Sequence, residues 1–314
     1  MSFDDEEVTI QGAVSIGAAV TCADRTRRNP AIVIIMGTGS LDRDGNGPGF
    51  RTDLYKNMAD MFAEWGYAVF RYDKRGLYRT GGDNKTAGLM DLVDDAISVI
   101  HYAKTQEYVD PEKVVVCGHS EGTMVAAILS EKEKVAGLLL LGGGPISLRD
   151  ALYYQNREVA QDGERMKGAK GFLVRKLATE EKGIAKVDKL FDKCGSTDKD
   201  RTMFGGIMMN SKWLREHDSY TSEDYVAILK AFDGPVLDII GTADLSADYR
   251  ALETLKGAPN VECYAPENVN HMLREIDDDN LMVNVKKQYL RLSSRPVHAE
   301  TQERMRRWLE SAVG

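Results

Sequence analysis

The chain has 314 residues, of which 43 % are hydrophobic and 29 % are charged. A chain of this length and composition buries a full core as one large or two small domains, which excludes a disordered or fibrous protein. Acidic residues outnumber basic ones, 49 to 41, for a net charge of −8. Nucleic acid and anionic membranes are therefore not the expected partners, because binding to either needs clustered positive charge.

Three further absences narrow the class of protein. The longest apolar runs, at residues 31–36 and 135–141, are far shorter than the roughly 20 residues that a membrane helix needs. The acidic start, residues 1–7, lacks the basic region of a secretory signal. Four scattered cysteines contain no CxxC pair, so neither a zinc site nor a disulfide framework is predicted. We therefore expect a cytoplasmic protein.

The predicted elements alternate between strand and helix through the first half of the chain. Two strands open it at residues 7–11 and 13–22, and an unbroken apolar run at 31–36 is typical of a strand covered on both faces. A glycine-rich loop at 37–40 follows. The later strands are 67–72, 113–117 and 135–141, with helices at 54–65, 89–100 and 123–129. Such alternation builds a mostly parallel sheet flanked by helices, the α/β class.

The alternation stops after residue 141. Residues 145–234 show helical periodicity without a convincing buried strand, and their basic and acidic residues nearly cancel, 16 to 15. Strands resume at 236–240 and 260–265, and a helix closes the chain at 300–312. We predict a core domain over 1–144 and 235–314 and a helical cap over 145–234 that lies over the sheet. A cap in that place forms a wall of the pocket, and its charge balance favours no uniformly charged substrate.

A candidate nucleophile lies between a strand and a helix. Gly118-His119-Ser120-Glu121-Gly122 matches Gly-x-Ser-x-Gly, in which the glycines leave room for a sharp turn. The bare pattern also fits an ordinary glycine-rich turn. Its position directly after strand 113–117 and before helix 123–129 favours a nucleophilic Ser120.

A serine hydroxyl needs a base, usually a histidine oriented by a carboxylate. His271 follows the last strand, where the carboxyl edge of the sheet presents it, although a purely structural histidine is the alternative. The other histidines are less suitably placed: His101 late in a helix, His119 beside the serine, His217 in the cap and His298 near the C-terminus.

The carboxylate is expected at another strand end, between serine and histidine in the chain. Asp244 meets this requirement, since it closely follows strand 236–240. Asp238 lies inside that strand, and Asp248 begins a helix, where an acidic residue is ordinary.

Backbone amides are needed where a carbonyl oxygen becomes anionic. The amide of Glu121 occupies one of the two positions that usually supply them, and the amide of Thr38 or of Gly39 occupies the other. The glycine-rich loop lacks the Lys-Ser/Thr of a P-loop and the spacing of a dinucleotide-binding loop, so nucleotide binding is disfavoured.

Together these segments resemble the α/β-hydrolase fold, and within it the esterase-like dienelactone-hydrolase and acyl-peptidase-like branch. The resemblance covers residues 7–145 and 234–314 and rests on the motifs at 37–45, 72–76, 118–122, 241–244 and 270–271. It implies hydrolysis of a carboxylic ester through an acyl-enzyme by Ser120, Asp244 and His271. Two departures are Met36, where many relatives have histidine, and the bulky Tyr78 after Gly76.

The candidate substrate-binding residues are mostly apolar and lie largely in the cap. They are Tyr78, Met203, Phe204, Met208 and Trp213. The cap residues among them equally fit a core of the cap itself.

The sequence thus predicts a cofactor-independent hydrolase of a small-molecule ester, acting as a monomer or homodimer. An amidase, a peptidase or an acyltransferase on the same triad, and a non-catalytic receptor of the same fold, remain alternatives.

Overall fold

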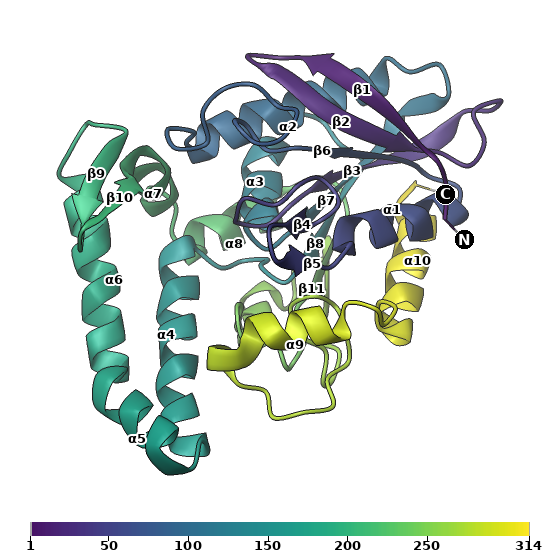
Figure 1. The fold of residues 1–314 in the computed structure, drawn as a ribbon. Coiled ribbons are helices and arrows are strands. Elements are labelled where there is room, and N and C mark those ends of the chain that lie inside the picture. The colour runs from purple at the N-terminus through teal and green to yellow at the C-terminus, as the bar shows by residue number, and fades with distance from the viewer. Residues whose placement is uncertain (1, 314) are drawn as a thin grey trace.

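The computed structural model describes residues 2–313 and has an eight-stranded sheet at its centre, while Met1 and Gly314 lie outside the described part. The order is β1-β2-β6-β3-β7-β8-β11-β12 (Figure 1). The strands are β1 (Asp5–Gln11), β2 (Ser15–Thr21), β3 (Asn29–Ile35), β6 (Ala68–Tyr72), β7 (Val109–His119), β8 (Gly137–Leu141), β11 (Val236–Ile239) and β12 (Val261–Tyr264). The pairs β1–β2 and β2–β6 are antiparallel, and all other neighbours in the sheet are parallel. The carboxyl ends of the six strands from β6 to β12 therefore meet at one edge.

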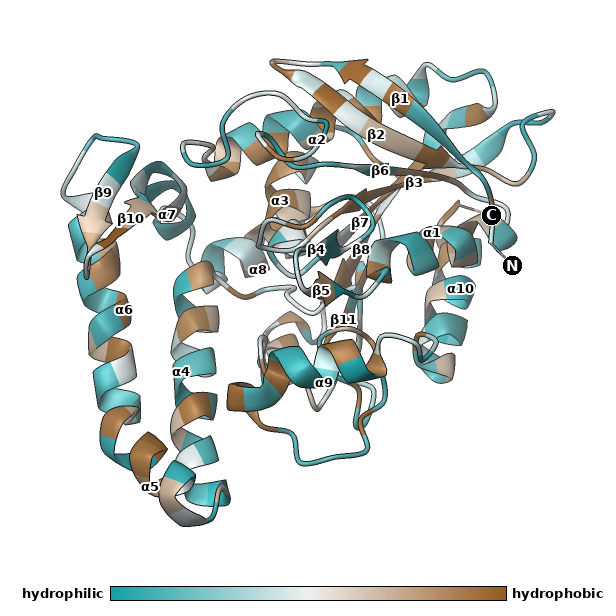
Figure 2. Cartoon of the chain, viewed as in Figure 1, coloured by the Kyte–Doolittle hydropathy of each residue, from teal (hydrophilic) through white to brown (hydrophobic). Residues whose placement is uncertain are grey.

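The inner strands are apolar on both faces because helices cover both. In β7, Val114 and Val116 face one layer, while Val115 and Cys117 face the other, and all four are fully buried. The first layer is α2 (Leu89–Lys104), α3 (Glu121–Ser130) and α8 (Ser222–Ala231); the second includes α1 (Leu54–Glu64) and α10 (Ala299–Val313). In Figure 2 the inner strands are largely brown, while the outer helices α1, α2 and α10 carry both brown and teal residues, as this packing requires.

Residues 148–218 form a helical arm beside the sheet. It consists of α4 (Leu148–Arg165), α5 (Gly168–Leu177), α6 (Glu180–Gly195), β9 (Arg201–Phe204), β10 (Ile207–Asn210) and α7 (Ser211–Asp218). Helices α4 and α6 lie side by side and project from the body (Figure 1). Side chains of Ser147 and Thr179 cap the two helices, which fixes where each begins.

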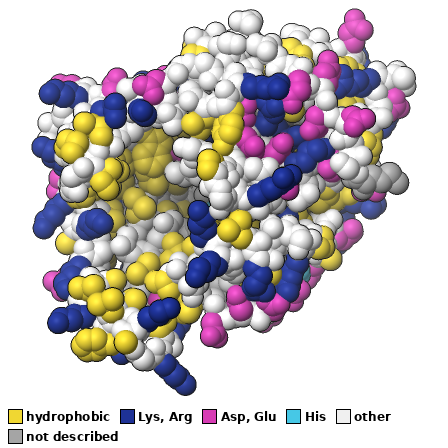
Figure 3. Space-filling model, in the orientation of Figure 1, with side chains coloured by type: hydrophobic (Ala, Val, Ile, Leu, Met, Phe, Trp, Pro, Cys, Tyr) yellow, Lys and Arg dark blue, Asp and Glu magenta, His cyan; other side chains and the backbone are white. Residues whose placement is uncertain are grey.

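The β9–β10 hairpin was not predicted, because its exposed side chains show no buried apolar run. Met203, Ile207 and Met208 are 50, 66 and 46 % exposed, and hydrophobic atoms gather over this side of the molecule in Figure 3. Helix α8, unlike this exposed hairpin, packs in the core. It falls within residues 145–234, yet its Tyr225 and Leu229 are buried in the same core as α2 and α3.

Five short elements complete the described part of the chain. They are the β4 (Asn46–Gly47) and β5 (Phe50–Arg51) pair after β3, the 3₁₀ turns η1 (Tyr249–Leu255) and η2 (Met282–Asn284), and α9 (Val285–Leu292). Within residues 2–313, no helix is both long and apolar enough to span a bilayer.

One carboxyl group is buried in the sheet itself. Asp238 in β11 has no exposed surface, and neither side-chain oxygen has a hydrogen-bond partner among the described residues. A Cβ on Gly144 would lie 2.0 Å from Asp238 Oδ2, so only glycine fits beside this carboxyl. Burial raises the pKa of Asp238 well above its usual range, because a low-dielectric site disfavours the anion. Burial therefore favours the protonated form of Asp238 in the native protein.

This proton makes stability depend on pH. In the unfolded chain the carboxyl ionises above about pH 4, whereas the raised pKa holds the proton to higher pH in the native state. The free energy of unfolding therefore falls as pH rises above the unfolded pKa. We expect the free energy of unfolding of Asp238→Asn, measured relative to wild type, to increase with pH. The increase should be at most about 1.4 kcal/mol per pH unit. Urea denaturation of both proteins at pH 4.5, 6.0 and 7.5 measures this. Curves that stay parallel across the range would contradict it.

Candidate active site

Ser120 lies in a sharp turn between β7 and α3 at the carboxyl edge of the sheet. Its φ is +55° and its ψ −123°, a strained combination for a residue with a side chain. Close packing holds the turn: a Cβ on Gly118 would lie 2.3 Å from the carbonyl oxygen of Gly122, and one on Gly122 would lie 2.1 Å from that of Ile35. The two glycines of the motif are thus required by backbone contact, and the turn leaves Ser120 partly exposed.

His271 and Asp244 form a buried pair at the same edge. Asp244 follows β11 and His271 follows β12, and His271 Nδ1 lies 2.8 Å from Asp244 Oδ2. The other oxygen, Oδ1, accepts from the amides of Ser246 and Ala247 at 2.7 and 3.0 Å. Because a carboxylate only accepts, it favours the tautomer with the proton on Nδ1 and leaves Nε2 as a base.

The structure brings all three predicted residues to one small cavity. Ser120 and His271 both line a cavity of about 130 Å³, and Asp244 lies directly behind His271. Among the described residues no hydrogen bond joins Ser120 Oγ to His271. Such bonds are often long in unliganded enzymes and tighten when substrate binds.

The competing candidates are engaged elsewhere. Asp248 bonds to Arg250 at the start of η1, and Asp238 lies inside the sheet beside Gly144. The remaining histidines outside the turn bond to other partners: His101 to Glu133, His217 to Glu121 and His298 to Thr301.

The predicted oxyanion amides flank Ser120. A Cβ on Gly37 would lie 2.7 Å from Ser120 Cβ, so the loop that carries Thr38 and Gly39 touches the nucleophile turn. Glu121 is the first residue of α3, where backbone amides have no partner inside the helix. None of the described residues accepts a hydrogen bond from the amides of Thr38 or Glu121. Both are thus available to an incoming oxygen, with the positive end of the α3 dipole behind them.

A buried hydrogen-bond chain joins the loops of the site. The amide of Gly37 donates to Tyr55 Oη at 2.8 Å, and Tyr55 Oη lies 2.9 Å from His119 Nδ1. His119 Nε2 lies 2.9 Å from the carbonyl oxygen of His271. Since a carbonyl only accepts, Nε2 carries the proton and Nδ1 accepts from Tyr55. Burial, with the neighbouring His271, lowers the pKa of His119 to about 3, so its ring is neutral at pH 7.

The sequence does not reveal this chain. Tyr55 belongs to the buried stripe of α1, and only the fold places its hydroxyl beside the middle histidine of the motif.

The side chain of Glu121 forms a second unpredicted cluster. Its carboxylate accepts from Lys74 Nζ at 2.6 Å, Trp213 Nε1 at 2.5 Å and His217 Nε2 at 3.2 Å. Burial alone would raise its pKa, but Lys74 and His217 outweigh that effect and hold the pKa of Glu121 well below its usual range. A buried carboxylate so paired ties the turn at Ser120 to α7 of the arm.

Of the residues predicted to bind substrate, only Trp213 lines a cavity beside the site, the one bordered by Thr38. Tyr78 is 54 % exposed and donates to the carbonyl oxygens of Ser40 and Asn46. Met203, Phe204 and Met208 are on the β9–β10 hairpin. Along the described chain, none of these four residues lines the cavity at Ser120 or the one bordered by Thr38. Residues 2–313 contain no cluster of three or more His, Cys, Asp or Glu side chains placed to hold a metal.

The hydrogen-bond chain through Tyr55 predicts that removal of the Tyr55 hydroxyl lowers stability. Tyr55→Phe leaves the Gly37 amide and His119 Nδ1 without partners, so we expect the free energy of unfolding to fall by about 1–3 kcal/mol. Labelling of Ser120 by a fluorophosphonate should also slow, because both loops lose an anchor. Tyr67→Phe, another buried tyrosine, is the control. Equal behaviour of the two variants in denaturation and labelling would refute the role of the chain.

Known proteins resemble this chain in both sequence and fold. Esterase EstD of Thermotoga maritima is 24 % identical over 282 residues, which cover 87 % of this chain. The aligned region spans about 60 % of the length of that relative.

Among solved structures, Est1E of Butyrivibrio proteoclasticus with bound ferulic acid has a TM-score of 0.56 at 15 % identity, covering 92 % of this chain and 99 % of that one. A hydrolase of Agrobacterium vitis S4 has a TM-score of 0.57 at 16 % identity, with full coverage of both chains. The esterase Pf2001 of Pyrococcus furiosus has 0.56 at 14 %, covering 99 and 94 %.

These likenesses confirm the predicted α/β-hydrolase fold. The sequence profile of one family, described as serine aminopeptidase S33, matches residues 46–259, more than half of the chain and both its nucleophile turn and Asp244. The chain therefore belongs to the serine aminopeptidase S33 family of α/β-hydrolases.

Proposed function

We propose that the protein hydrolyses carboxylic esters through an acyl-enzyme, with Ser120, His271 and Asp244 as the catalytic triad. The observation that carries this proposal is the 2.8 Å contact of His271 with Asp244 beside a cavity that Ser120 and His271 share. Proteins named as esterases among its relatives add support.

The geometry supports the following sequence of proton transfers. His271 Nε2 takes the proton of Ser120 Oγ as the oxygen attacks the ester carbonyl carbon, and Asp244 stabilises the imidazolium. The carbonyl oxygen becomes anionic and accepts from the amides of Thr38 and Glu121, with Gly39 adjacent. His271 then protonates the leaving alcohol oxygen as the carbon–oxygen bond breaks. A water molecule then attacks the acyl carbon as His271 takes its proton. The bond from Ser120 Oγ to the acyl carbon breaks, the acid leaves, and His271 returns the proton to Ser120 Oγ. No cofactor takes part in these steps.

The family description raises the alternative of an aminopeptidase, which must bind the ammonium group of a peptide. A free carboxylate near the nucleophile would serve that purpose. Among the described residues, no acidic side chain lines the cavity at Ser120, and Glu121, in the neighbouring cavity, is paired with Lys74. These linings favour a neutral ester over a peptide with a charged amino terminus.

We also propose that residues 145–234 act as the cap of this site. Three hydrogen bonds support the role. Trp213 and His217 of α7 hold the Glu121 carboxylate, and the Tyr154 hydroxyl of α4 donates to the backbone oxygen of Asp244 at 3.0 Å. The cap thus contacts Glu121, the residue after the proposed nucleophile, and Asp244 of the proposed triad.

The proposal predicts that removal of the Ser120 Oγ atom greatly reduces kcat. Ser120→Ala should reduce kcat for p-nitrophenyl acetate and butyrate by about 10⁴-fold or more, because the nucleophile is lost. Ser130→Ala, at the other end of α3, should keep wild-type kcat. Both variants are first shown to unfold at the wild-type denaturant concentration.

Fluorophosphonate labelling separates the alternatives. Labelling of wild type but not of Ser120→Ala, without ester turnover, would retain the triad and reject esters as the substrates. No labelling of wild type would reject the triad and favour a non-catalytic receptor.

A further inference from the structure

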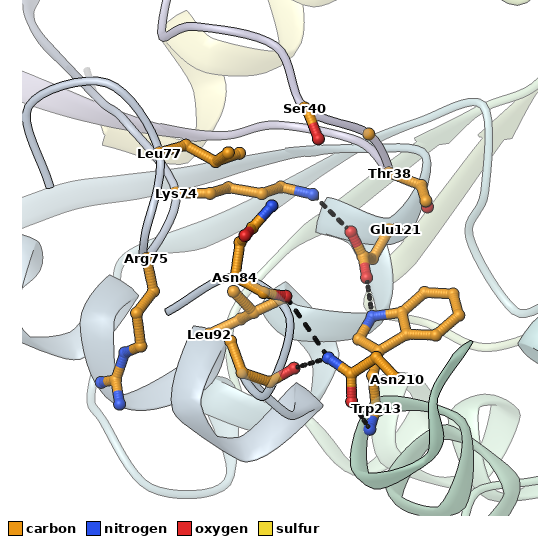
Figure 4. Close-up of a pocket in the computed structure, with 12 residues that line it drawn as sticks. Thr38, Ser40, Lys74, Arg75, Leu77, Asn84, Leu92, Glu121, Asn210 and Trp213 are labelled. Carbon is orange, nitrogen blue, oxygen red and sulfur yellow. Dashed lines mark hydrogen bonds and ion pairs between the residues drawn. The ribbon is translucent and has the colours of Figure 1, made fainter. Parts of the chain in front are cut away.

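A second cavity, of about 220 Å³, borders the oxyanion loop (Figure 4). Thr38 lines both this cavity and the one at Ser120, and the next residue after the nucleophile, Glu121, forms part of its wall. An ester carbonyl held by the amides of Thr38 and Glu121 therefore lies at the boundary between the two cavities. One substituent of the ester has direct access to each.

The position of the general acid decides which substituent enters. His271 must reach the leaving oxygen, so the alcohol lies on the His271 side. His271 lines the cavity at Ser120 and does not line the second one. The acyl group is accordingly the substituent directed into the second cavity, whose small volume suits a short chain.

The walls of this cavity carry hydrogen-bond donors with spare capacity. Lys74 Nζ has three N–H groups, of which one is used by Glu121. The side-chain amide of Asn84 and the hydroxyl of Ser40 also line the cavity, and no described residue is hydrogen-bonded to either group. These side chains surround one space in Figure 4. An aliphatic acyl chain would leave them without partners once water is expelled, which costs binding energy.

The charges around the cavity are already balanced. Lys74 is paired with Glu121, and Arg75, the other basic lining residue, is paired with Asp91 and Asp95. A carboxylate in the acyl chain would meet the buried Glu121 anion nearby, whereas an uncharged oxygen accepts from Lys74 or Asn84 without that repulsion.

We propose that this cavity is the acyl subsite and selects short acyl groups bearing an uncharged oxygen acceptor, such as a ketone, ether or hydroxyl. Lys74 and Asn84 are its donors. The inference rests on the proposed esterase function and adds the chemical class of the acid.

The test compares three p-nitrophenyl esters of similar length: pentanoate, 4-oxopentanoate and hemisuccinate. Each kcat/KM is divided by the hydroxide-catalysed rate of the same ester, which removes intrinsic reactivity. We expect 4-oxopentanoate to exceed both others by about 10-fold, the size of one hydrogen bond to a charged or well-placed donor. In Asn84→Leu the preference for 4-oxopentanoate over pentanoate should shrink several-fold, mainly through KM. Asn57→Leu, the same substitution at an exposed position of α1, should retain the preference.

A second measurement does not depend on turnover. 4-Oxopentanamide should protect Ser120 from fluorophosphonate labelling at lower concentration than pentanamide in wild type, and this difference should shrink in Asn84→Leu. Equal rates and equal protection for oxo and aliphatic compounds would overturn the subsite while leaving the esterase intact. A preference for hemisuccinate would overturn its uncharged character. A wild-type protein that fluorophosphonate fails to label would overturn the proposed function, and with it this inference.

Discussion

The backbone of Ser120 has a conformation that residues with side chains rarely adopt, and the contacts that enforce it organise the rest of the site. The turn packs so tightly on the end of β3 that Gly122 has no room for a Cβ beside Ile35. The same approach places Gly37 against Ser120 and so brings the loop of Thr38 close to the turn that carries Glu121. Strain at the proposed nucleophile and the position of the proposed oxyanion amides are two results of one packing arrangement.

Buried polar groups then hold the surrounding loops in register with that turn. The chain from Gly37 through Tyr55 and His119 to the backbone of His271 joins the loops after β3, β7 and β12. Removing these groups from water is costly unless every donor meets an acceptor, so the chain has few alternative arrangements. Its neutral His119 lies beside His271, the proposed base, and places no positive charge there at pH 7.

Glu121 extends the same principle to the cap. Its amide belongs to the proposed oxyanion site, while its carboxylate holds Lys74 and two side chains of α7. A buried carboxylate that loses its partners is strongly destabilising, so moving α7 away from Glu121 would lower the stability of the fold. The position of the arm and the integrity of the nucleophile turn are therefore coupled through one residue.

The periodicity of the sequence was sufficient to predict the sheet and its flanking helices. Apolar runs such as the one that became β3 are local signals of burial on both faces, and the glycines around Ser120 signal a turn by themselves. The hairpin β9–β10 was missed because an exposed strand pair leaves no such run. The predicted pocket residues Met203, Phe204 and Met208 are on that hairpin and line neither cavity beside the site.

The sequence by itself determined the fold class, and it was sufficient to propose Ser120, His271 and Asp244 as the triad, because each inference depends on residue type and on order along a few strand ends. Only the tertiary structure decided what surrounds them. Tyr55 with His119, and Glu121 with Lys74, Trp213 and His217, are separated by 47 to 96 residues and meet through packing of distant elements. Contacts of that kind leave no periodic trace in the chain, since they depend on where the whole core places each side chain.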